Sequence, residues 1–141
     1  VLMDENLNIG GNLISFQKLM RASVKLNFPE IVEWAAEMAE AGRERQKNFL
    51  NYALHLIRQC VMLNYEGNNL VKMSKEEKDF SSKFAQFIHN GNMQQFCEEL
   101  NKAHFHLERN ANPKILFTDL GFRMNELLKI PKPQLIETTN N

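Results

Sequence analysis

His104, His106 and Glu108 are the residues whose types and spacing come nearest to a metal site. In a helix, residues two positions apart diverge by about 200°, so His104 and His106 cannot readily share an ion. His104 and Glu108 share a face at the i, i+4 spacing, but two ligands do not complete a site. A di-iron bundle needs Glu-x-x-His on two helices, and none of the four histidines follows a glutamate at that spacing. The pattern predicts no metal and no cofactor, and it places His104 at the rim of a helical core.

The sequence also contains no motif for nucleophilic catalysis or for nucleotide binding. The chain has two cysteines, Cys60 and Cys97, which lie far apart on apolar helical stripes. That placement predicts reduced, buried thiols in a cytoplasmic protein rather than a zinc ribbon or a disulfide. There is no G-x-S-x-G, and Gly10-Gly11 lacks the lysine of a phosphate-binding loop. We therefore expect a chain that is not itself an enzyme and has no small-molecule substrate.

The charges are balanced over the whole chain, and one local cluster of cations stands out. Lysine and arginine together number 17, as do aspartate and glutamate, so no global field draws the chain to nucleic acid or a membrane. Locally, Arg43, Arg45 and Lys47 fall at an expected helix N-terminus, where cations oppose the macrodipole. This placement is consistent with contact to an acidic partner or a phosphate, or with an ordinary solvated surface. No apolar run approaches the ~20 residues that span a bilayer.

The apolar residues that must position these groups recur at helical spacing along the whole chain. We predict an all-α, single compact bundle of about six helices, over residues 13–26, 29–41, 43–65, 75–89, 93–111 and 113–128. Residues 13–130 form the domain, 1–12 are a linker or the end of a preceding domain, and 131–141 are a flexible tail. Because the first residue is Val1, we expect a fragment of a longer protein.

Polar residues mark the expected helix ends. Ser74 with Glu77 predicts a capping box, and so does Asn92 with Gln95. Gly42 is placed to stop the second helix, since glycine accepts the left-handed conformation at C′. A loop is expected from Leu70 to Met73.

The last two helices meet at a proline elbow. In it, Asn112 is expected to cap a helix whose first residue is Pro113, because proline has no N–H to leave unsatisfied. The full run reads L-x-x-A-x-x-x-L-x-R-N-x-N-P-K, with these residues at the fixed positions: Leu100, Ala103, Leu107, Arg109, Asn110, Asn112, Pro113 and Lys114. This run, followed by a leucine-rich amphipathic helix, resembles the end of the C-terminal collar domain in bacterial DNA polymerase III clamp-loader subunits.

The resemblance implies a role in assembly. Residues from about Phe16 to Leu128 are compatible with the collar domain. The resemblance implies an ATPase-type module N-terminal to the collar, outside this chain. It implies that this chain packs beside the collar domains of other subunits, gamma/tau and delta, and meets DNA and the sliding clamp only through modules outside it. The delta-prime type is preferred over gamma/tau because the chain ends soon after the last helix. Candidate subunit-interface residues are Arg43, Arg45, Arg109, Asn110 and Lys114.

Two other classes of function stay open from the sequence. One is a free-standing helical adaptor or regulator that binds a partner peptide in a groove, which an exposed apolar patch would favour. The other is a small helical enzyme or metal protein, which would need a buried polar cluster that sequence spacing does not reveal.

Overall fold

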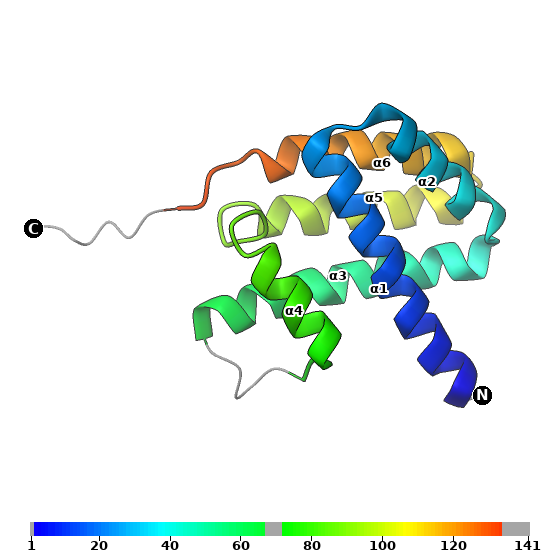
Figure 1. The fold of residues 1–141 in the computed structure, drawn as a ribbon. Helices are drawn as coiled ribbons and strands as arrows, with labels where there is room; N and C mark the ends of the chain where they lie inside the picture. The colour runs from blue at the N-terminus through cyan, green and yellow to red at the C-terminus, as the bar shows by residue number, and fades with distance from the viewer. Residues whose placement is uncertain (1, 67–71, 134–141) are drawn as a thin grey trace, which may run out of the picture.

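The computed structural model describes residues 2–66 and 72–133, and its described residues contain six helices and no strand. The expected all-α bundle is confirmed. The helices are α1 (Leu2–Lys25), α2 (Phe28–Glu40), α3 (Arg43–Glu66), α4 (Lys75–Lys83), α5 (Met93–Glu108) and α6 (Pro113–Leu128), as Figure 1 shows. Part of the expected loop before Ser74, and most of the expected tail after Ile130, lie outside the described residues.

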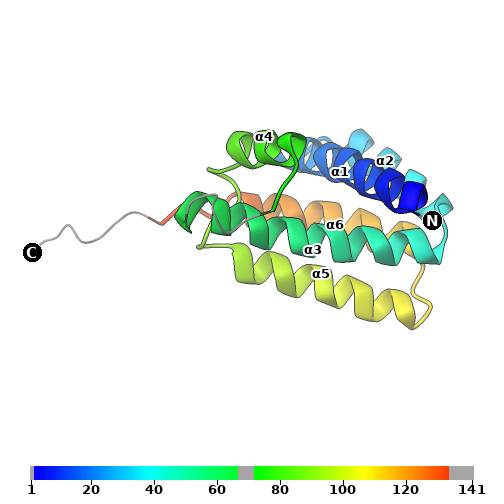
Figure 2. The same cartoon turned by 90° about the horizontal axis from the view of Figure 1, so that it is seen from below.

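Helices α3 and α6 form the middle of the bundle. In Figure 2, α1, α2 and α4 lie above these two helices and α5 lies below them. Helix α6 packs against α1, α2 and α5, whereas α3 packs against α1, α4 and α5. The chain therefore brings the start of α3 to the same end of the molecule as the turn between α5 and α6 (Figures 1 and 2).

A series of aromatic rings connects five of the helices through the core. Phe16 of α1 contacts Phe80 of α4 at 5.5 Å between ring centroids and Phe49 of α3 at 6.4 Å. Trp34 of α2 lies 5.6 Å from both Phe49 and Phe117 of α6. Each ring is buried, and the indole N–H of Trp34 donates to a carbonyl oxygen of α1 at 3.0 Å. Edge and tilted contacts of this kind add about 0.5–1.5 kcal/mol each beyond the burial of apolar area.

Two hydrogen bonds hold α6 against α1, and a glycine allows α6 to approach α2 closely. The Ser23 hydroxyl donates to the carbonyl of Gly121 at 3.2 Å, and the Asn125 amide donates to the carbonyl of Ser23 at 2.7 Å. Gly121 faces Ile31 of α2, and a Cβ added there would lie 2.5 Å from Ile31 Cγ2. Only a residue without a side chain permits this approach of α6 to α2.

The first helix begins earlier than the sequence predicts. Residues 2–12, expected as a linker or the end of a preceding domain, belong to α1 rather than to an irregular segment before Leu13. Asn12 is buried, and the position of a Cβ on Gly11 would be 3.4 Å from Arg45 Nη2 at the start of α3. This packing against α3 offsets the cost of glycine in a helix, about 1 kcal/mol per residue.

The fourth helix ends at Lys83, earlier than the stop predicted at Asn90-Gly91. Two buried polar residues, His89 and Asn92, organise the turns that follow. The Asn92 amide donates to the carbonyls of Phe87 and Leu127, at 2.8 and 2.9 Å. His89 Nδ1 accepts from the Gly91 N–H at 3.1 Å, so its Nε2 carries the proton and donates to the carbonyl of Ile130 at 3.0 Å. These bonds connect the turn to the end of α6.

The predicted capping box of Asn92 with Gln95 is therefore wrong. Asn92 precedes α5, but its side chain makes no cap bond there, because its oxygen accepts from the backbone N–H of His89 at 3.0 Å. The other terminal signals are confirmed. Ser74 and Glu77 form the complete capping box, and Gly42 adopts φ +93° just after α2. On α3, Leu56 is buried and Leu54 is partly buried, while Asn64 and Tyr65 are exposed.

We predict that Gly121→Ala destabilises the fold by about 1–2 kcal/mol. Overpacking a tight contact costs about 1–3 kcal/mol, which exceeds the gain of about 1 kcal/mol in helix propensity. Urea denaturation of the wild type, Gly121→Ala, Ile31→Ala and the double variant measures this. The double variant should be more stable than the sum of the single changes predicts. A Gly121→Ala variant more stable than wild type would contradict the close α2–α6 contact.

Candidate functional site

The turn between α5 and α6 has a backbone that is fixed by its own hydrogen bonds. Asn110 N–H donates to Leu107 O at 3.1 Å, and Ala111 N–H donates to His106 O at 3.0 Å. This pair of bonds is a Schellman motif, whose C′ residue must adopt a left-handed conformation. Asn110 does so with φ +67°, which asparagine tolerates better than most residues. Asn112 then caps α6 by accepting from Ile115 N–H at 3.1 Å, as expected.

The structure joins two stretches that the sequence identifies separately. Arg43, the first residue of α3, donates from Nη2 to Asn110 Oδ1 across 67 positions of sequence. Gln46 holds the start of α3 in place, because its buried amide donates to the carbonyls of Met38 and Ala39 at the end of α2. We call Arg43, Arg109, Asn110 and Lys114 the elbow surface; all four are exposed.

Arg109 makes local contacts on α5. Its Nη1 donates to the carbonyl of Phe105 at 3.1 Å, and its guanidinium lies 3.5 Å from the centroid of the Phe105 ring. The guanidinium of Arg109 therefore satisfies a carbonyl in the last turn of α5. The cation–π contact, about 0.5–1 kcal/mol at an exposed site, holds Arg109 and the half-exposed Phe105 ring together at the surface.

Arg45 lies apart from the elbow surface. Its Nη2 is beside Gly11 of α1, whereas Arg43 points to Asn110. The two arginines are separated by about 200° around α3, which explains why they reach different neighbours. The interface role assigned to these residues stays a prediction.

Sequence reasoning missed the contribution of Gln46 and of the exposed residues next to the elbow. Gln46 lies between two cations and belongs to no recognisable motif. A polar residue near the start of a helix commonly binds the end of the preceding helix, and this was the signal available in the sequence. Ile115, which follows Lys114 directly, is 69% exposed, more than any other large apolar residue whose side chain the structure describes. Its place in the periodic pattern could have shown that it faces away from the core.

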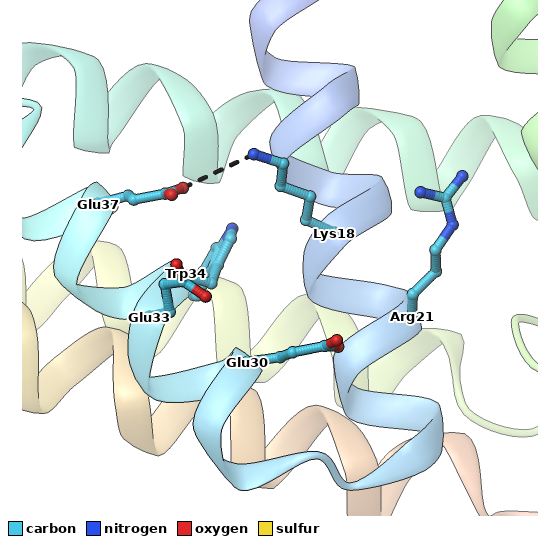
Figure 3. Close-up of a pocket in the computed structure, with 6 residues that line it drawn as sticks. All are labelled: Lys18, Arg21, Glu30, Glu33, Trp34 and Glu37. Atoms are coloured by element: carbon cyan, nitrogen blue, oxygen red, sulfur yellow. Dashed lines mark ion pairs between the residues drawn. The ribbon is translucent and has the colours of Figure 1, made fainter.

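A hollow lies between α1 and α2 (Figure 3). Its volume is about 320 Å³, and it is lined by Lys18 and Arg21 on one side, by Glu30, Glu33 and Glu37 on the other, and by Trp34. Lys18 Nζ lies 3.8 Å from Glu37 Oε1, and both side chains are more than half exposed. An exposed pair of this kind adds little stability. The two walls have opposite charge and partly neutralise each other, so they favour no single charged ligand.

His104 and Glu108 lie on one face, as predicted, with Nδ1 and Oε1 3.7 Å apart. Within residues 2–66 and 72–133, no group of three histidine, cysteine, aspartate or glutamate side chains is placed to hold a metal ion. In that same part of the chain, none of the helices combines the length and apolar character needed to cross a membrane.

Cys60 and Cys97 are free and buried, as predicted. Burial, with a smaller contribution from the carboxylate of Glu77, raises the pKa of the Cys60 thiol to about 11, although the Ser81 hydroxyl acts to lower it. Burial also raises the pKa of Tyr52, whose hydroxyl donates to Glu77 Oε2 at 2.7 Å. Both groups are thus held in their protonated forms, which are poor nucleophiles.

We expect the fold to lose stability in alkali through these two groups. A pKa that is raised on folding contributes stability below the unfolded pKa, near 9 for Cys60, and the contribution is lost as pH rises through about 11. The loss attributable to Cys60 is roughly 2–3 kcal/mol. Denaturant unfolding from pH 8 to pH 11 measures it. Cys60→Ala should flatten the pH dependence, and an unchanged slope would contradict this assignment.

We predict that Asn112→Ala destabilises the protein by about 1 kcal/mol, whereas Arg109→Ala costs only about 0.5 kcal/mol, the lower value for an exposed cation–π contact. Asn112 accepts a hydrogen bond that no other side chain at the start of α6 supplies, and Arg109 is exposed. Thermal and urea unfolding of both variants tests the difference. Equal losses would show that Arg109 belongs to the structural framework of the elbow.

Comparisons of this chain with protein-family models, with curated proteins and with solved structures found no match.

Proposed function

We propose that this chain is a non-catalytic assembly domain of a DNA polymerase III clamp-loader subunit of the delta-prime type. Its role is to pack beside the collar domains of the gamma/tau and delta subunits in the cytoplasm. The resulting collar would hold the ATPase-type modules in order while the sliding clamp is loaded onto DNA. DNA and the clamp are reached only through those modules.

One observation carries the proposal. The elbow motif separates into a buried or capping set and an exposed set. Leu100, Ala103 and Leu107 are buried, and Asn112 caps α6. The exposed set is Arg109, Asn110 and Lys114, and Arg43 joins it from a distant part of the chain by donating to Asn110. A rigid exposed surface of this kind suits recognition of another protein.

The geometry also fits a ring-forming contact. A ring requires each domain to present two different surfaces to two neighbours, which is a heterologous arrangement. The elbow surface lies at one end of the bundle, and the hollow between α1 and α2 lies along its side (Figures 1 and 3). Two dissimilar surfaces on one rigid helical unit are what such a ring needs.

A free-standing helical adaptor is the second candidate. The observation that favours it is the exposed Ile115 beside Val32 and Lys114, because an apolar patch with charged neighbours can bind a peptide helix. Binding to collar domains of the same clamp loader distinguishes the two functions, since an adaptor has no reason to recognise them.

We predict that the chain forms a mixed species of defined mass with the collar domains of the other subunits of its own clamp loader. Light scattering on the chain alone and on the mixture measures this. Arg43→Ala combined with Arg109→Ala should weaken the mixed species about tenfold, because both side chains present donors at the elbow. Arg58→Ala is the matched control, since Arg58 is an exposed arginine four turns further along α3.

Full-length subunits provide the reference for this experiment. If they assemble and the isolated chain does not, regions outside the chain are required and the proposed role of this domain fails. If the full-length protein carrying the chain also does not join the other subunits, the clamp-loader proposal is wrong and the adaptor becomes the better explanation.

A further inference from the structure

We propose that the exposed side of α6 binds an amphipathic helix of the neighbouring collar domain. That helix would present two apolar side chains about one turn apart and a carboxylate that pairs with Lys114. We call Ile115, Thr118, Asp119 and Phe122, with Val32 of α2, the α6 face. The inference rests on the proposed function and names the partner chemistry of a surface that continues from the elbow through Lys114.

The α6 face is a ridge with a hollow on each side. A hollow of about 390 Å³ lies between α5 and α6, and one of about 450 Å³ lies where α6 meets α2. Ile115 borders both hollows and is 69% exposed. Helices pack by placing the ridges of one into the grooves of the other, so a single incoming helix can straddle Ile115 and enter both hollows.

The residues that line the two hollows indicate which apolar side chains a partner helix would present. The α5–α6 hollow is lined in part by Ala103, Ala111, Leu116 and Leu120, and the alanines leave space that larger side chains would fill. The other hollow has Val32 and Phe122 in its walls, and the Phe122 ring lies 5.3 Å from that of Phe28. Leucine, isoleucine or methionine side chains of a partner helix fit such surroundings.

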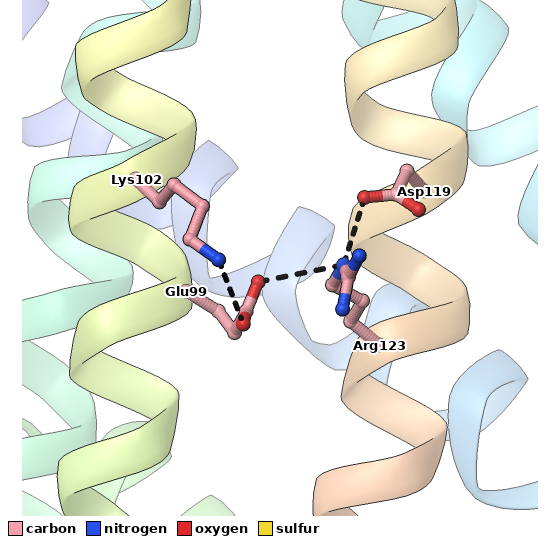
Figure 4. A network of polar contacts seen from close by, with 4 residues as sticks. All are labelled: Glu99, Lys102, Asp119 and Arg123. Atoms are coloured by element: carbon pink, nitrogen blue, oxygen red, sulfur yellow. Dashed lines mark hydrogen bonds and ion pairs between the residues drawn. The ribbon is translucent and has the colours of Figure 1, made fainter.

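The charged residues around the α6 face indicate which charged side chain the partner helix would present. Figure 4 shows Arg123 between Asp119 and Glu99, at 3.0 and 3.7 Å, with Lys102 3.6 Å from Glu99. These two cations and two carboxylates neutralise one another across α5 and α6. Lys114 forms no ion pair with any residue that the structure describes, and it lies in the first turn of α6, where the helix dipole adds positive potential. A carboxylate from the partner is therefore complementary at this end.

The same charges disfavour a second copy of this chain as the occupant. In an antiparallel two-fold pairing centred on the face, Ile115 would meet Phe122 of the second copy. Asp119 lies next to the centre of that pairing, between Thr118 and Asp119, so the Asp119 carboxylates of the two copies would approach each other on the same flank of the helix pair. Like charges brought together at an interface oppose association.

The test compares variants of this chain in binding to the separate collar domains of the gamma/tau and delta subunits, by calorimetry or fluorescence titration. Ile115→Glu should weaken binding to one of these domains about 30-fold or more, as expected for the centre of an interface. Lys114→Met should weaken it several-fold at low salt and reduce its dependence on NaCl. Met62→Glu, an exposed apolar position near the far end of α3, should leave the affinity unchanged.

The outcomes separate this inference from the proposed function. If wild type binds a collar domain and Ile115→Glu binds equally well, the α6 face is not the contact, while the assembly role stands. If wild type binds none of them, both proposals fail. Self-association of the chain that Ile115→Glu abolishes would assign the face to a second copy and overturn the inference. Ile115→Ala, with an expected loss of about tenfold, serves as a second variant should the glutamate alter the fold.

Discussion

The aromatic contacts that run from Phe80 through Phe16, Phe49 and Trp34 to Phe117 are the constraint on which the rest of this structure depends. They connect α1, α2, α3, α4 and α6, so a movement of α1, α2, α3 or α6 disturbs rings on at least two other helices. Close-packed interiors resist such adjustment, because a side chain displaced from its neighbours loses contacts and leaves a cavity. The positions of the helix ends at the surface follow from this shared core.

The elbow illustrates how the core determines a surface. Buried leucines hold α5 against its neighbours, and Gln46 fixes the start of α3 to the end of α2. The Schellman bonds fix the turn itself, so Arg43 and Asn110 meet although 67 positions separate them. A surface that is ordered before binding loses less conformational entropy when a partner arrives, which is why the assembly proposal centres on this end of the bundle.

Helix count and most helix ends are predictable from the sequence, because they depend on interactions within a few residues. The capping box of Ser74 and the cap of Asn112 are of this kind. The errors fall where distant contacts override local signals. Gly11 continues α1 because it packs beside Arg45, and Asn92 does not cap α5 because its side chain binds backbone groups before α5 and at the end of α6.

The sequence by itself determined the all-α class, the buried faces of the helices, the buried free thiols and the five candidate interface residues. These follow from periodicity, from residue type and from the elbow motif, which are local properties of the chain. Only the tertiary structure decided that Arg43 joins the elbow while Arg45 turns toward α1, and that Ile115 stands between two hollows. Those arrangements depend on how three helices approach one another. Contacts between helices, such as that of Gly121 with Ile31, fix this approach, and no spacing along a single helix encodes it.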